Sequence, residues 1–153
     1  MSDGILDPVF GTLTYSLNDS YWEGKVALPS GQALNVTLEP REEVLESFLA
    51  AAREAFADLC QKEQEIHVGI LANLLSMYND SWRDEEEDDP EPISGEEFMR
   101  RIQQRPALLQ LNAPLTQRFS RTLYYEDGNL FAGHTIEVNL DSENRVASVG
   151  ILG

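Results

Sequence analysis

The stretch LFAGHTIEVNLDSENRVASVGILG, residues 130–153, decides the fold that we expect. Residues 130, 132, 134, 136, 138 and 140 share one face and are apolar except for His134, and this spacing is the period of a strand with one buried face. Turn-forming residues follow at 141–144, and the strand pattern resumes at 146–152. The pattern predicts a terminal β-hairpin whose apolar face must be covered by the rest of the chain.

Strand patterns also occur before this hairpin and near the other end of the chain. A strand is predicted at 119–125, and the turn former Asp127-Gly128 separates it from the hairpin, so the last third of the chain forms a three-stranded meander. A second set of strand patterns, at 9–17, 22–28 and 34–38, predicts another three-stranded meander.

The segment between the two meanders has the spacing of helices. Apolar residues recur every three or four positions at 45–59 and again at 66–78. A third helix is predicted to begin at Ser94, because Ser94 and Glu97 have the spacing of a capping box. Segment 107–111 fits either a short strand or an irregular connector.

These elements predict a single α+β domain over residues 1–153. We expect a mainly antiparallel sheet of about six strands, in two three-stranded meanders, with helices inserted between them and packed on one face. Helices placed there would cover the apolar face of the sheet, which strands alone leave open to water.

The net charge of −16 restricts the partners of the chain. Binding to nucleic acid or to an anionic membrane relies on Lys and Arg, so neither partner is expected. A basic protein partner fits this charge. With Cys60 as the sole cysteine no intrachain disulfide can form, and residues 1–11 lack the pattern of a signal peptide, so we expect a cytoplasmic protein.

Acidic residues are densest at 83–93, where two prolines also interrupt any helix. Like charges repel at this density, and we expect a solvated acidic loop. A calcium site is the less favoured interpretation, because the alternating ligands and central glycine of an EF-hand loop are missing. The residues of this loop proposed for partner binding are Asp84, Glu85, Glu86, Glu87, Asp88 and Asp89.

His134 is the candidate functional histidine. It falls on the apolar face of the predicted strand 130–140, where it could act as a general base or a metal ligand. The favoured alternative is a buried histidine that is hydrogen-bonded to the backbone or to a carboxylate. The other histidine, His67, follows Glu63 by one helical turn, and no metal-binding or cofactor-binding motif surrounds either histidine, so no cofactor is expected.

Two aromatic residues, Tyr124 and Phe131, fall on the strand faces opposite the presumed core. Exposed aromatic side chains next to acidic ones are frequent in protein interfaces. We therefore take Tyr124 and Phe131 as candidates for an interaction surface, with ordinary packing as the alternative.

Short motifs at both ends of the chain resemble those of a known family. They are Phe10-Gly11-x-Leu13, Trp22-x-Gly24-x-Val26 and Gly133-His134-x-Ile136-x-Val138. In this order they resemble a family of uncharacterised bacterial domains, some of whose relatives are thought to be immunity proteins encoded beside polymorphic toxins. The resemblance implies a similar role and carries over no catalytic residue.

Charge and resemblance together favour a non-enzymatic interaction protein, with neutralisation of a basic toxin as its role. One alternative is a small enzyme that uses His134 and a carboxylate as an acid–base pair. Another is a structural subunit that self-associates through its helices. The sequence leaves the oligomeric state open.

Overall fold

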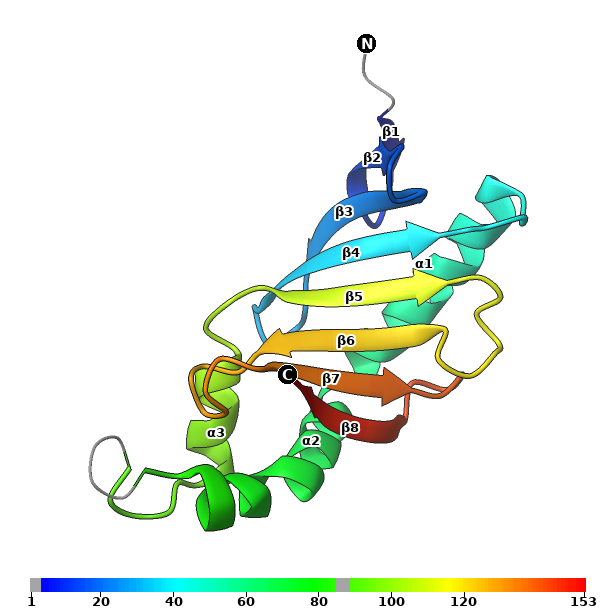
Figure 1. Cartoon of the computed structure of the whole chain (residues 1–153). Helices are drawn as coiled ribbons and strands as arrows, with labels where there is room; N and C mark the ends of the chain where they lie inside the picture. Colours follow the sequence, from blue (N-terminus) through cyan, green and yellow to red (C-terminus); the bar gives the residue numbers. More distant parts are fainter. Residues whose placement is uncertain (1–3, 85–88) are drawn as a thin grey trace.

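A single eight-stranded sheet, in the order β1 to β8, forms the centre of the computed structural model, which describes residues 4–84 and 89–153 (Figure 1). The strands are β1 (Ile5–Asp7), β2 (Gly11–Ser16), β3 (Tyr21–Ala27), β4 (Ala33–Glu39), β5 (Ala107–Asn112), β6 (Arg121–Glu126), β7 (Thr135–Leu140) and β8 (Val146–Leu152). The helical elements are α1 (Leu45–Gln61), α2 (Glu63–Met77), the π-helical turn η1 (Tyr78–Trp82) and α3 (Gly95–Ile102).

The sheet is antiparallel except between its two middle strands. β4 and β5 run parallel, in a register from Leu34 opposite Ala107 to Glu39 opposite Asn112. A parallel pair requires a long crossover, and here the crossover contains α1, α2, η1 and α3. The helices lie behind the sheet in Figure 1 and leave its front face uncovered.

The α+β class with helices on one face is confirmed, but the expected number of strands is wrong. The sheet has eight strands because a short β1 precedes β2 and because 107–112 forms β5. β5 joins the two predicted meanders into one sheet by pairing with both β4 and β6. The alternating pattern of β5 buries Ala107, Leu109 and Leu111 against the helices.

The helical spacing correctly identifies the side chains of the core. Phe48, Ala52 and Phe56 of α1 are buried, as are Ile70 and Leu74 of α2. The helices separate at Lys62, whose backbone leaves helical geometry at φ −104° and ψ 10°. No helix in the described ranges is long and apolar enough to cross a membrane.

The third helix begins as its capping pattern predicts. The Oγ of Ser94 accepts a hydrogen bond from the backbone N–H of Glu97, at 3.1 Å. Ser94 thereby satisfies one of the first N–H groups of the helix, which have no partner inside it.

The predicted strand at 130–140 is wrong over its first five residues, because a carboxylate bends the chain there. Asp127 accepts hydrogen bonds from the backbone N–H groups of Asn129 at 3.0 Å and of Phe131 and Gly133 at 2.8 Å. An aspartate that bonds the following backbone in this way competes with the strand ladder. β7 therefore begins only at Thr135.

This turn moves Phe131 from the expected outer face into the core. Its side chain is 0% exposed and packs against the rings of Tyr78 at 5.9 Å and Phe98 at 6.1 Å. Phe131 is therefore a core residue and not part of an interaction surface. The other end of the last meander also differs, since Phe119 has a positive φ of 62° and is 64% exposed, and β6 begins at Arg121.

Candidate functional site

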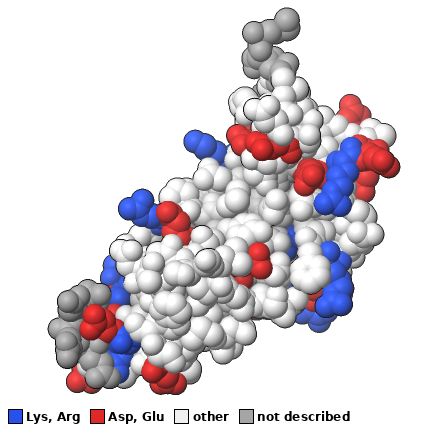
Figure 2. Space-filling model, viewed as in Figure 1, with Lys and Arg blue, Asp and Glu red and all other residues white. Residues whose placement is uncertain are grey.

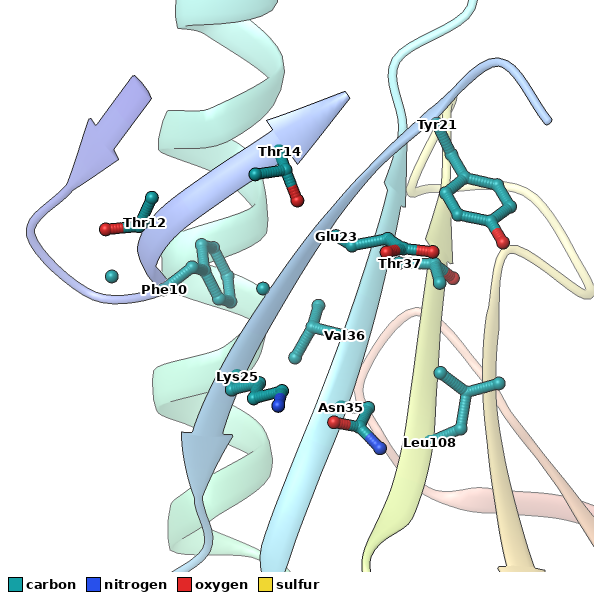
Figure 3. A pocket seen from close by; sticks show the side chains of 12 residues that line it. Phe10, Thr12, Thr14, Tyr21, Glu23, Lys25, Asn35, Val36, Thr37 and Leu108 are labelled. Carbon is teal, nitrogen blue, oxygen red and sulfur yellow. The ribbon is translucent and has the colours of Figure 1, made fainter. Parts of the chain in front are cut away.

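The uncovered face of the sheet carries a polar groove of about 780 Å³ at its N-terminal end (Figure 3). Charged side chains are sparse over the middle of this face and lie mostly near its rim (Figure 2). The side chains that line the groove come from β2, β3, β4 and β5 and from the turn before β2; they are Phe10, Thr12, Thr14, Tyr21, Glu23, Lys25, Asn35, Val36, Thr37 and Leu108.

A glycine in β3 allows the wall of this groove to form. β2 pairs with β3 over Thr14–Ser16 only, and the chain before it crosses close to Gly24. A Cβ at Gly24 would lie 2.7 Å from the Leu13 Cδ2 and 3.0 Å from the Phe10 carbonyl oxygen. Only a residue without a side chain lets these groups approach so closely.

Hydroxyl, amide and single charged groups make up the chemistry of the groove. Glu23 and Lys25 place one carboxylate and one ammonium on the same side of β3. Loss of water contact, together with the charges of Asp19 and Glu23, raises the pKa of Tyr21. The buried Oγ1 of Thr37 has no hydrogen-bond partner in the described part of the chain. This arrangement can hydrogen-bond a polar ligand, and it lacks the paired nucleophile and base of a hydrolase.

Tyr124 lies on the same uncovered face, as the strand pattern predicts. A second hollow, of about 500 Å³, shares Asn35 and Leu108 with the groove and reaches Tyr124 and Leu152. The hydroxyl of Tyr124 donates to Gln110 Oε1 at 3.4 Å, and burial of the ring raises its pKa.

His134 lies outside any strand, in contrast to the prediction. It is half-buried and packs against the ring of Trp82, with 6.0 Å between the ring centroids. The space next to it is occupied by Gly153, where an added Cβ would lie 2.4 Å from His134 Nε2. Among the described residues no carboxylate comes within ion-pair distance of His134. The structure therefore does not assemble the acid–base pair of the enzyme alternative from the residues that it describes.

The prediction of a solvated loop is wrong at Asp89. Asp84 is exposed, and Glu85, Glu86, Glu87 and Asp88 lie outside the described residues. Asp89, however, is only 6% exposed. It accepts hydrogen bonds from Arg101 Nη2 at 2.7 Å and Nη1 at 2.8 Å, and from the hydroxyl of Tyr78.

These contacts account for the pKa values at this end of the molecule. The Arg101 guanidinium lowers the pKa of Asp89 to about 2, although burial opposes the shift. Burial and the Asp89 carboxylate raise the pKa of Tyr78 to about 12. Asp89 therefore anchors the end of the acidic run to α3, and its charge is not available to a partner.

A buried polar cluster beneath the turn between β3 and β4 was not predicted from the sequence. Glu63 accepts hydrogen bonds from the Ser30 backbone N–H at 2.9 Å and from the Ser30 Oγ at 2.6 Å. The Nε2 of His67 lies 3.5 Å from a Glu63 oxygen and has no hydrogen-bond partner in the described residues. Burial lowers the pKa of His67, and the charge of Glu63 opposes this shift.

The order of these three groups differs from that of a catalytic triad. In a triad the hydroxyl donates to the histidine, and the acid lies behind the histidine. Here the Ser30 hydroxyl donates to Glu63 and not to His67, so the three groups do not form the relay of a triad. The helical spacing of Glu63 and His67 is visible in the sequence, whereas the approach of Ser30 depends on tertiary packing. Within residues 4–84 and 89–153, no group of three or more His, Cys, Asp or Glu side chains could hold a metal ion.

Unpaired acidic charge lies mainly in the helical connection between β4 and β5. The cations of this connection are used internally, as in Arg53–Asp7 at 2.6 Å, Lys62–Asp58 at 3.1 Å and Arg100–Glu97 at 2.5 Å. Its exposed acids that have no ion pair to a described residue are Glu42, Glu43, Glu46, Glu54, Glu65, Asp80, Glu91 and Glu96. We call these eight residues the acidic helix surface.

A family model described as "Uncharacterized protein conserved in bacteria (DUF2262)" matches residues 7–151 of the chain. The match spans the sheet from β2 to β8 and the whole helical connection, and so includes the groove and the acidic helix surface. No curated protein and no solved structure matches the chain.

Proposed function

The chain belongs to a family of proteins conserved in bacteria (DUF2262), and from this premise we propose that it acts by binding, as an acidic protein that captures a basic protein partner. The observation that carries the proposal is the acidic helix surface. Its carboxylates are exposed, and the neighbouring cations already form ion pairs within the molecule.

The positions of the exposed acids favour the helical connection over the sheet face as the docking site. Charged side chains are sparse over the middle of the sheet face in Figure 2. Exposed acids occur in α1 at Glu46 and Glu54, in α2 at Glu65 and in the segment that leads into α3 at Glu91. Exposed carboxylates contribute a negative potential, which speeds the approach of a cationic protein.

Neutralisation of a toxin is the specific role that we propose. A nuclease or another toxin with a basic substrate groove would be blocked by an acidic surface seated in that groove. The proposal is non-enzymatic, because it requires only an exposed acidic surface on a rigid support. It also accounts for the surplus of acids, which exceeds what the internal ion pairs use.

Co-expression with the product of a neighbouring toxin gene tests the role directly. We expect the wild-type chain to restore growth of the host, and we expect Glu42→Lys/Glu43→Lys/Glu46→Lys to lose this protection. The control is Glu23→Lys/Glu137→Lys, which introduces the same kind of charge change on the sheet face and should still protect the host.

Binding measurements on the purified protein and toxin test whether charge drives their association. Affinity should fall steeply as salt is raised, because exposed charges are screened within about 10 Å at 0.1 M salt. Equal loss of binding in the helix-surface variant and in the sheet-face variant would rule out the acidic helix surface as the docking site. Absence of any protection by the wild-type chain would rule out the immunity role.

A further inference from the structure

The two edges of the sheet differ in their protection against pairing with another strand. β1 has three residues, and its Asp7 is fixed to Arg53 of α1 at 2.6 Å. β8 has seven residues and pairs with β7 on one side only. An unpaired edge of this kind presents a row of backbone N–H and C=O groups that can pair with a further strand.

β8 lacks the features that usually block such pairing. Its sequence, VASVGIL, contains no charged residue and no proline. The register with β7 shifts once, opposite Asn139 and Leu140, and is regular from Ser148 to Leu152. Natural sheets commonly protect exposed edges with lysine, proline or repeated bulges, and residues 148–152 have none of these.

The helix beneath β8 leaves its edge accessible. α2 contacts the start of β8 at Gly69, where an added Cβ would lie 2.7 Å from Val146 Cγ2. Ala72, Asn73 and Ser76 follow Gly69 by three, four and seven positions, so they lie on the same side of the helix, and all three are small and exposed. No bulky side chain of α2 at these positions covers the edge.

We propose that β8 pairs antiparallel with β8 of a second copy of the chain, so that two eight-stranded sheets join into one. The strand is self-complementary when Gly150 lies on the two-fold axis. Val149 then faces Ile151 of the partner subunit on the helix side, and Ser148 faces Leu152 of the partner subunit on the open side. Pairs of β-branched side chains such as Val and Ile stabilise neighbouring strands.

The negative charge of the chain restricts where two copies can meet. Each copy carries −16, so close approach through the acidic helix surface would be repulsive. β8 has no charge of its own and lies at a part of the molecule where Figure 2 shows few charged side chains. A two-fold pairing of identical strands also closes on itself and leaves neither copy of β8 exposed.

Light scattering on size-exclusion fractions tests the proposal with a charge-swap pair. Ser148 is exposed and Leu152 is 44% exposed, so both positions accept a charged residue without disturbing the core. Ser148→Lys/Leu152→Lys places two lysines opposite each other at both ends of the pairing, and we expect the dissociation constant to rise at least about tenfold. Ser148→Lys/Leu152→Glu places opposite charges there and should remain a dimer.

The proposed register places residue 148 of one copy opposite residue 152 of the other, so the Lys/Lys and Lys/Glu variants must behave differently. A wild-type chain that stays monomeric at high micromolar concentration overturns the proposal, even if its β8 amides become protected when a different protein is added. Dimerisation of the Lys/Lys variant at wild-type strength, or loss of the dimer in the Lys/Glu variant, also overturns it. Circular dichroism of each variant establishes that it is folded, and hydrogen exchange of the β8 amides that slows with wild-type concentration supports the pairing.

Discussion

Asp89 and Arg101 form a bidentate ion pair, with nitrogen–oxygen distances of 2.7 and 2.8 Å. The pair connects the end of the acidic run to α3. The carboxylate is 6% exposed, so water contributes little to its solvation. The pair therefore has a structural role, in contrast to the exposed acids of the helix surface.

We expect Asp89→Asn to destabilise the protein by roughly 2–3 kcal/mol, because it removes one of the two carboxylates that pair with the partly buried Arg101 guanidinium and leaves Glu97, at 2.8 Å, as the other. The pKa of Asp89 is lowered in the folded state, so its contribution is full above about pH 4, the pKa of an unfolded aspartate, and is lost as the pH falls towards about 2. Urea unfolding of both proteins across the acid range measures this difference. Parallel stability curves for wild type and Asp89→Asn below neutral pH would contradict the assignment.

Glu63 should be as important for folding as a core residue. Glu63→Ala removes the acceptor of two hydrogen bonds from Ser30, at 2.6 and 2.9 Å, and leaves the Ser30 N–H unpaired. We expect a loss of about 2 kcal/mol in the free energy of unfolding. The control is Glu65→Ala on the exposed side of the same helix, which should change stability by no more than about 0.5 kcal/mol. Equal stability of the two variants would be incompatible with an anchoring role for Glu63.

His67 should make stability depend on pH near neutrality. Burial lowers its pKa in the folded state, so the unfolded chain binds the proton more strongly. The stabilising contribution of the neutral ring is complete above about pH 6.5 and is lost as the pH falls below that value. We expect thermal unfolding of the wild type to shift to lower temperature between about pH 7 and 5, and His67→Gln to reduce this shift. An unchanged shift in His67→Gln would assign the pH dependence to another group.

Gly24 and Gly150 should respond oppositely to the same substitution. Gly24→Ala forces a Cβ to within 2.7 Å of Leu13 Cδ2, so we expect a loss of about 1–3 kcal/mol and a displaced β1–β2 hairpin. A Cβ at Gly150 meets nothing within 4 Å, and Gly150→Ala should keep or slightly raise stability. Chemical denaturation at low protein concentration compares the two. Equal stability of both variants would show that the contact at Gly24 relaxes without cost.

Periodicity predicted the helices and most strands because it records which side of an element is buried. The alternation at Ile136, Val138 and Leu140 was confirmed, and so was the capping of α3 by Ser94. The same pattern failed at Phe131, because the Asp127 carboxylate bonds the next backbone N–H groups and bends the chain before the strand can begin.

The polar sites were less accessible to sequence reasoning, since their partners are distant in the chain. Nothing near Asp89 in the sequence indicates that Arg101 will cover it, and nothing near Glu63 indicates the approach of Ser30. Tyr124 was placed on the uncovered face correctly, because the strand alternation alone determines its side. Local patterns thus predict orientation within an element, and only the assembled fold determines which polar groups meet.

The parallel ladder between β4 and β5 has a kinetic consequence. Each antiparallel neighbour is reached through a short connection, whereas β4 and β5 are separated by residues 40–106. Closing a loop of that length costs chain entropy before any contact offsets it, so we expect this junction to form in the slowest step of folding. Val36→Ala, which weakens β4 where it faces Leu109, should then slow refolding, while substitutions within the β7–β8 hairpin should mainly accelerate unfolding.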